Sequence, residues 1–202
     1  MNDNLIEYSA VMPRKTQVIT IWDRQRRMQD FFGLEGTMYV ALARPTPWSD
    51  ENDPDISDTY PPMPDETATE LDGLIGMQRI QWKKYAKPYV TPTSAEKDDP
   101  ATVYYKGLYY KTTSDLDVAL SEGFTSVMVM MTADRDQYFP VDIAYRQVGL
   151  YVQVGVNDEY LDDEQFSMLS EDKKGHLAAI ENFEPVSRQM DQMEKFFLLL
   201  EF

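Results

Sequence analysis

The pattern of side chains near the start of this chain follows two different periods, a helical one and then the alternation of Met38, Val40 and Leu42 with Tyr39 and Ala41. Between residues 14 and 32, apolar side chains recur at the three- and four-residue spacing of one helical face, and Gly33 follows. From Thr37 to Ala43 the period shortens to two, which is typical of a β-strand. We therefore expect a helix followed by a short strand.

The clearest local pattern lies in the middle of the chain. Two Tyr-rich triplets, residues 103–105 and 108–110, flank Lys106-Gly107, which predicts a β-hairpin whose glycine adopts a positive φ. Further strands are expected around residues 77–82, 127–131, 145–156, 177–180 and 196–202. Short helices are expected at residues 66–75, ended by Gly76, and at 114–122, opened by a capping box of Ser114 and Asp117 and ended by Gly123. A further short helix through Leu169 is expected to be capped by Asp162 or Asp163.

Short helices inserted between six or more strands predict a mainly β or α+β fold. Residues 49–70 are rich in Asp, Glu and Pro and have little to bury, so they should form a long surface excursion. The charged, Pro-containing loop at residues 94–100 is the one candidate boundary. We expect residues 1–202 to form a single domain.

Composition narrows the range of functions. The 202 residues include no cysteine, which excludes disulfides and thiolate metal sites. The formal net charge of −16 opposes contact with nucleic acid or an anionic membrane surface. No apolar run approaches the roughly 20 residues that span a bilayer, and Asp3 and Glu7 are untypical of a signal peptide. The chain should be soluble, used without secretion, and free of cofactors.

Candidate catalytic chemistry is sparse. The single histidine, His176, follows Lys173-Lys174-Gly175 and is expected in a solvated loop. The glycines are scattered singly, without a phosphate-binding loop. A run of acids could collect calcium, but its spacing differs from an EF-hand, and a solvated acidic loop is the preferred interpretation. That run comprises Asp50, Glu51, Asp53, Asp55 and Asp58.

Two apolar groups have a binding interpretation and a structural one. The hairpin tyrosines could stack on bases or sugars, but a hairpin face that covers a core explains them better, as it does Met128, Met130 and Met131. The C-terminal end is richer in apolar residues than one chain end usually needs. It is equally consistent with core and with a partner interface.

Three separated segments of this chain carry a resemblance to a known family. The first is the turn Arg44-Pro45-Thr46-Pro47-Trp48, followed by an acidic loop, Tyr60-Pro61 and Gly76. The second runs from Gly175-His176-Leu177 to Pro185, and the third from Met190-Asp191-Gln192 to Phe202. In this order, which agrees along nearly the whole chain, they resemble the dimer-forming baseplate wedge subunit of contractile-tailed bacteriophages, although residues 89–101 lack a long insertion that family members can carry.

The resemblance implies a β-sandwich-like body with helices in its loops, a homodimer, and contacts with other baseplate wedge subunits. It also implies no catalysis, and a place in the tail baseplate of a virion assembled in the host cytoplasm. We expect the interfaces to involve apolar residues of the Trp-containing turn and the C-terminal end. These candidates are Trp48, Tyr60, Met190, Met193, Phe196, Phe197 and Phe202.

Two other classes of function remain open from the sequence. An acidic protein that mimics DNA would need acids ranked along one face at phosphate-like spacing. A tail-tip lytic glycosidase would need two opposed carboxyl groups, and 35 acidic residues offer too many pairs to single one out.

Overall fold

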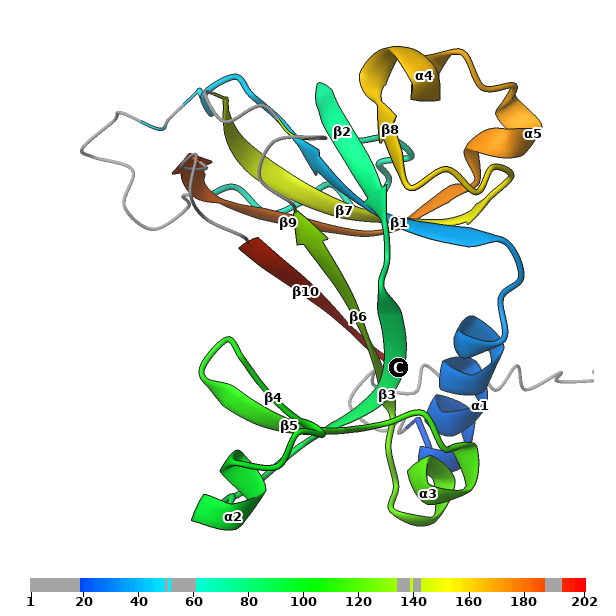
Figure 1. Cartoon of the computed structure of the whole chain (residues 1–202), viewed down its shortest axis with the longest axis vertical. Helices are drawn as coiled ribbons and strands as arrows, with labels where there is room; N and C mark the ends of the chain where they lie inside the picture. The colour runs from blue at the N-terminus through cyan, green and yellow to red at the C-terminus, as the bar shows by residue number, and fades with distance from the viewer. Residues whose placement is uncertain (1–18, 50, 52–60, 134–138, 140–142, 188–193) are drawn as a thin grey trace, which may run out of the picture.

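The computed structural model describes residues 19–49, 51, 61–133, 139, 143–187 and 194–202. Two five-stranded antiparallel sheets form the body (Figure 1). Sheet A has the order β8-β2-β1-β7-β9, and its strands are β8 (Tyr160–Asp162), β2 (Leu74–Arg79), β1 (Thr37–Ala43), β7 (Ala144–Val154) and β9 (His176–Ser187). Sheet B has the order β10-β6-β3-β5-β4, and its strands are β10 (Glu194–Glu201), β6 (Ser126–Ala133), β3 (Trp82–Pro88), β5 (Leu108–Thr113) and β4 (Thr102–Tyr105).

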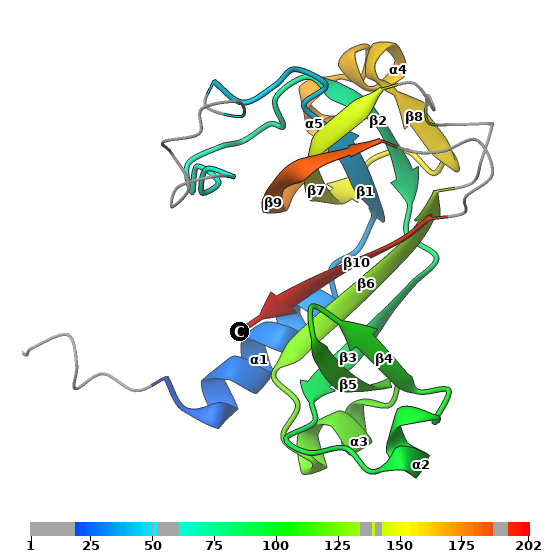
Figure 2. The ribbon, with the colours of Figure 1, turned by 90° about the vertical axis from the view of Figure 1, so that its left-hand side faces the viewer.

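The main hydrophobic core lies between the two sheets. Val40 of β1 and Leu150 of β7 are fully buried in the same cluster as Val127 and Val129 of β6. Figure 2 shows sheet A above this core and sheet B below it, with β6 and β10 running up toward sheet A. The prediction of a mainly β or α+β fold is therefore confirmed, and the shared core is that of a sandwich-like body.

A second cluster covers the other face of sheet A. Tyr39, Met77 and Tyr151 are buried there beneath Leu71 and Phe166. Phe166 belongs to α4 (Asp163–Ser167), which Asp162 caps by accepting a hydrogen bond from Gln165 N at 2.7 Å. This cap is one of the two predicted for that helix.

The remaining helices lie mostly beside sheet B. They are α1 (Ile21–Phe32), α2 (Ser94–Lys97), α3 (Leu116–Ser121) and, next to sheet A, α5 (Glu171–Lys174). The first begins later than the sequence pattern indicated, because Thr20 accepts a hydrogen bond from Asp23 N and acts as its N-cap. Residues 14–18 of the predicted helix lie outside the described residues.

Four local predictions were wrong. Residues 66–75 contain no helix; β2 begins at Leu74, and Gly76 lies inside it because any side chain there would collide with the Tyr160 ring. The charged loop contains α2, capped by Thr93 and Glu96. The N-cap of α3 is Asp115, not Ser114. His176 opens β9, although it is exposed as expected.

Candidate interaction surface

The Trp48 turn is held against sheet A by bonds within the chain. The Trp48 indole N–H donates to the carbonyl oxygen of Phe183 in β9 at 3.4 Å. The Arg44 guanidinium lies 3.8 Å from the centre of the Trp48 ring, a cation–π contact. Arg44 has a positive φ of 56°, which turns the chain sharply as β1 ends. Trp48 is 9% exposed, so most of its ring faces its own chain.

An ion pair fixes the start of the acidic loop on the same surface. Glu51 binds the Arg146 guanidinium through both carboxylate oxygens, and Arg146 also donates to the Pro45 carbonyl at 2.9 Å. The hydrogen bond from Arg146 holds the pKa of the Glu51 carboxyl below its ordinary value, with a further lowering from the Trp48 backbone N–H. Asp50, Asp53, Asp55 and Asp58 lie outside the described residues, as do three candidate interface residues, Tyr60, Met190 and Met193.

The other candidates, Phe196, Phe197 and Phe202, lie together at the C-terminal end. Phe196 packs against the shared core, where its ring meets Tyr145 at 5.7 Å. Phe202 also packs on that core and touches Phe31 of α1 at 5.5 Å. Phe197 points to the opposite face of sheet B. All three remain partly exposed, so the C-terminal strand contributes both to the core and to the surface.

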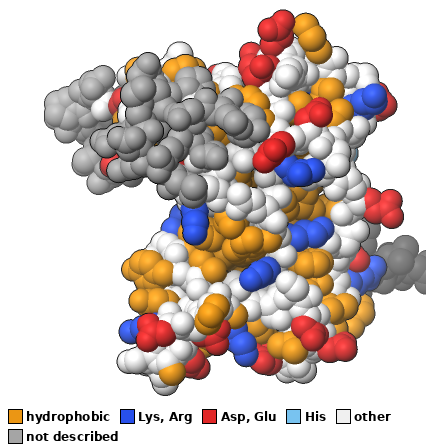
Figure 3. Space-filling view, viewed as in Figure 1, with side chains coloured by type: hydrophobic (Ala, Val, Ile, Leu, Met, Phe, Trp, Pro, Cys, Tyr) orange, Lys and Arg blue, Asp and Glu red, His pale blue; other side chains and the backbone are white. Residues whose placement is uncertain are grey.

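The opposite face of sheet B carries a half-buried apolar surface, which we call the sheet B patch. It consists of Trp82, Val103, Tyr105, Phe197 and Leu199, packed around the buried Ala86, Tyr110 and Met128. In Figure 3, hydrophobic side chains gather in the part of the view where β3, β6 and β10 lie. Apolar surface left partly open in this way is typical of protein–protein contact.

The sheet B patch exists because the sheet curls strongly. Tyr105 of β4 and Phe197 of β10 belong to opposite edges of the sheet, yet their ring centres are 6.4 Å apart. Tyr105 also donates to Glu181 of β9 at 3.3 Å, and Lys106 forms an ion pair with the same carboxylate at 2.6 Å. Local sequence patterns do not predict this closure, because it depends on contacts between residues about 75 to 90 positions apart.

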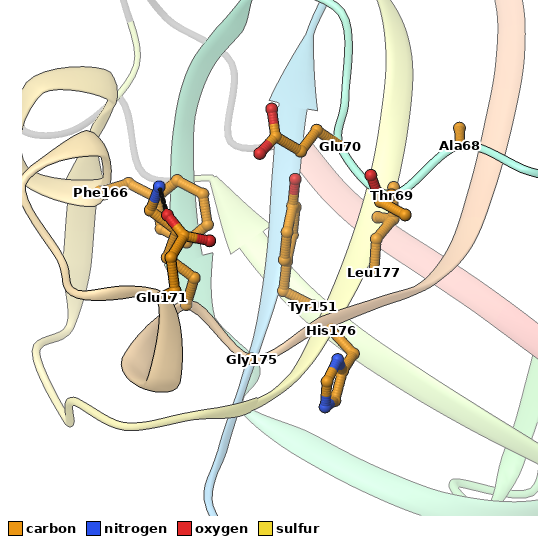
Figure 4. Close-up of a pocket in the computed structure, with 10 residues that line it drawn as sticks. Ala68, Thr69, Glu70, Tyr151, Phe166, Glu171, Gly175, His176 and Leu177 are labelled. Atoms are coloured by element: carbon orange, nitrogen blue, oxygen red, sulfur yellow. Dashed lines mark hydrogen bonds and ion pairs between the residues drawn. The ribbon is translucent and has the colours of Figure 1, made fainter.

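A hollow of about 250 Å³ lies beside sheet A, and Glu70, Tyr151, Glu171 and His176 are among the residues that line it (Figure 4). Glu171 is paired with Lys174 at 2.7 Å, and Figure 4 shows the His176 imidazole directed away from Glu70 and Glu171. The Tyr151 hydroxyl accepts from Leu71 N at 3.3 Å, and burial raises its pKa. These groups do not form a nucleophile beside an orienting base.

Within the described ranges, no group of three or more His, Asp or Glu side chains could hold a metal ion. None of the helices there is long and apolar enough to cross a membrane. Several described acids are bound to basic side chains on the surface, including Glu51, Glu122 and Glu181. That pairing is a poor match to a row of free carboxylates that imitates a phosphate backbone.

Comparison with known proteins identifies one family. The sequence profile of the family described as "Baseplate wedge 3 tail fiber network component" matches residues 19–202. No curated protein sequence matches the chain. The matched range contains every described residue, including both sheets, the Trp48 turn and the sheet B patch. The resemblance to a phage baseplate wedge subunit is confirmed.

Proposed function

Because this chain belongs to the family of baseplate wedge 3 tail fiber network components, we propose that it is a non-enzymatic structural subunit of a contractile phage tail. In this function it pairs with a second copy of itself and binds neighbouring wedge subunits. These contacts hold the wedge together while the tail assembles in the host cytoplasm and later contracts. The subunit then remains in the virion, within the baseplate.

The observation that carries this proposal is the sheet B patch. It joins aromatic and aliphatic side chains from β3, β4 and β10 on one face. Central apolar side chains with polar residues around them are the usual anatomy of a stable interface. Here Lys84 lies 5.1 Å from the Trp82 ring, and the ion pair between Lys106 and Glu181 borders the patch. Burial of Trp82 against a partner would remove the largest of these rings from water.

The test combines a mass measurement with reconstitution. Sedimentation equilibrium of the full chain is expected to give about 47 kDa, twice the 23.4 kDa of one chain. Mixing the chain with the other wedge subunits of its own phage is expected to give a larger complex that co-migrates on size exclusion. A Trp82→Glu variant should weaken that complex, whereas Met63→Glu, at a position that is 89% exposed and lies away from the patch, should not. A monomer that joins none of the wedge subunits would contradict the proposal.

A further inference from the structure

At one end of the sheet B patch, three side chains form a row across neighbouring strands, which we call the Trp82 row. Met130 of β6 lies opposite Trp82 of β3 and, on its other side, opposite Phe197 of β10. The Trp82 and Phe197 rings are 6.0 Å apart. All three side chains are partly exposed. The Trp82 row is therefore apolar surface that stays in contact with water in the isolated chain.

Two lysines flank the Trp82 row on the same face of sheet B. Lys84 follows Trp82 by two positions in β3, and its ammonium group lies 5.1 Å from the centre of the Trp82 ring. Lys195 precedes Phe197 by two positions in β10 and is exposed. Side chains two positions apart in a strand share a face. In Figure 3, basic side chains border the hydrophobic ones in this part of the view.

The two lysines lie on opposite sides of the Trp82 row. Lys84 pairs with Met128 of β6, and Lys195 pairs with Thr132 of the same strand. Met130, in the centre of the row, lies between these two positions. A ligand that covers the row therefore meets one positive charge on each side.

Neither lysine has an acidic partner among the residues that the structure describes. The ion pairs found there engage other basic residues, including Lys106 and Arg146. Glu194, next to Lys195, points to the other face of sheet B and accepts from the Tyr145 hydroxyl at 2.7 Å. In a chain with 35 acidic and 19 basic residues, two lysines without a carboxylate beside an apolar row make a local positive surface.

The preceding lysine in β3 has a structural role that Lys84 lacks. Lys83 donates to the carbonyl oxygen of Phe32, the last residue of α1, at 2.7 Å. Burial lowers the pKa of this lysine. Lys84 points to the opposite face, where it makes no hydrogen bond or ion pair with the described residues. Substitution of Lys84 therefore tests binding without removing a contact that supports the fold.

We propose that the Trp82 row and its two lysines bind an acidic segment of a neighbouring wedge subunit. An apolar side chain of that segment covers the Trp82 row, and carboxylates on either side of it pair with Lys84 and Lys195. This inference rests on the proposed function and names the chemistry of the partner. The apolar centre provides most of the affinity, whereas the charges at the rim accelerate association and select the partner.

A second copy of this chain fits the Trp82 row less well than an acidic neighbour. A two-fold contact brings one surface against itself, so Lys84 and Lys195 would need an unpaired acid on the same face. Glu181 is already bound to the β4–β5 hairpin. Glu201 lines a hollow with Leu108 of that hairpin, roughly 20 Å along β10 from Lys195.

Removal of the lysine charges tests the inference. Lys84→Met and Lys195→Met keep the length of the side chain and its apolar stem. At about 50 mM salt, each should weaken binding to the wedge subunit that joins the chain in reconstitution about threefold, and the double variant about tenfold. At about 300 mM salt these differences should shrink, because salt screens exposed charges. Isothermal titration calorimetry with the full chain measures both effects.

Lys97→Met is the matched control. Lys97 also lies beside an aromatic ring, 5.3 Å from the centre of Tyr109, but it belongs to α2, outside both sheets. Its substitution removes the same charge from the same chain and should leave the affinity unchanged. Equal losses in Lys97→Met and Lys84→Met would assign the effect to net charge and overturn the inference.

Amine–carboxylate cross-linking identifies the source of the acids. A carbodiimide joins an ammonium group to a carboxylate that it contacts, and mass spectrometry of the assembled complex locates the link. We expect links from Lys84 and Lys195 to Asp or Glu of a neighbouring wedge subunit. A mixture of isotope-labelled and unlabelled chains separates links to a second copy from links within one chain. Links of either of these two kinds, without links to a neighbour, would overturn the inference.

Failure of this inference can be distinguished from failure of the proposed function. A chain that joins none of the wedge subunits contradicts both. If Trp82→Glu weakens the complex while the lysine variants and salt leave it unchanged, the contact is apolar alone, and only the acidic partner is refuted. Weaker binding in both lysine variants, a smaller effect at high salt and cross-links to acids of a neighbouring subunit together support the inference.

Discussion

Replacement of Leu150 by alanine tests whether the two sheets form one domain. Leu150 is fully buried in sheet A, opposite Val40 of β1, and belongs to the core cluster that also contains Val129 and Met131 of sheet B. If that core joins the sheets, a cavity made from the side of sheet A should destabilise sheet B to the same extent. The single domain expected from the sequence would then unfold in one transition.

The expected loss of stability follows from the complete burial of Leu150. Removing three buried carbon atoms of leucine costs about 3 kcal/mol when the cavity does not collapse. The free energy of unfolding of a chain of this size falls by about 3 kcal/mol per molar urea. The urea concentration at the midpoint of unfolding should therefore fall by about 1 M. Leu108→Ala is the matched control, because Leu108 is 50% exposed at the hairpin, and its effect should stay within about 0.5 kcal/mol.

Fluorinated tryptophan reports on each sheet separately. Trp48 is bound to β9 of sheet A, and Trp82 lies in β3 of sheet B. Fluorine NMR during urea unfolding should show both resonances losing intensity at one midpoint, and Leu150→Ala should shift the two equally. A variant in which the Trp48 signal is lost early while the Trp82 signal keeps its wild-type midpoint would refute the shared core and divide the chain into two domains.

Two other consequences of the geometry are open to measurement. The hydrogen bond from Arg146 lowers the pKa of Glu51 from 4.5. The stabilisation from this ion pair is therefore present above pH 4.5 and is lost as the pH falls through the lowered pKa. The Trp48 resonance should change only in that acidic range, and Arg146→Met should remove the change. Gly107 has a φ of 84° and open space around its α-carbon, so Gly107→Ala should cost about 1 kcal/mol in urea unfolding, and Gly107→Asn should cost less.

Local sequence patterns predicted the elements whose structure depends on near neighbours. The strand Thr37–Ala43 has the predicted bounds, and its two alternating sets of side chains are buried on opposite faces of sheet A. The hairpin around Lys106-Gly107 forms because both turn residues adopt positive φ. Met128 and Met131 are fully buried, as expected for core residues.

Elements that depend on distant contacts were predicted only in part. A strand was expected around residues 77–82, but β2 already begins at Leu74, because it pairs with β1 and because Gly76 admits the Tyr160 ring. β9 extends to Ser187, beyond the apolar stretch seen in the sequence, because β7 supplies its partner. The candidate interaction surface was likewise predicted only in part. The apolar C-terminal end is visible in the sequence, whereas Trp82 joins the sheet B patch only because the sheet curls.

The most direct test of the account is a cryo-electron microscopy map of the assembled tail baseplate of the phage that encodes this chain. We expect density for this chain within the wedge, with the Trp82 face covered by a neighbouring subunit. Absence of the chain from the baseplate, or its presence with the Trp82 face open to solvent, would contradict the account.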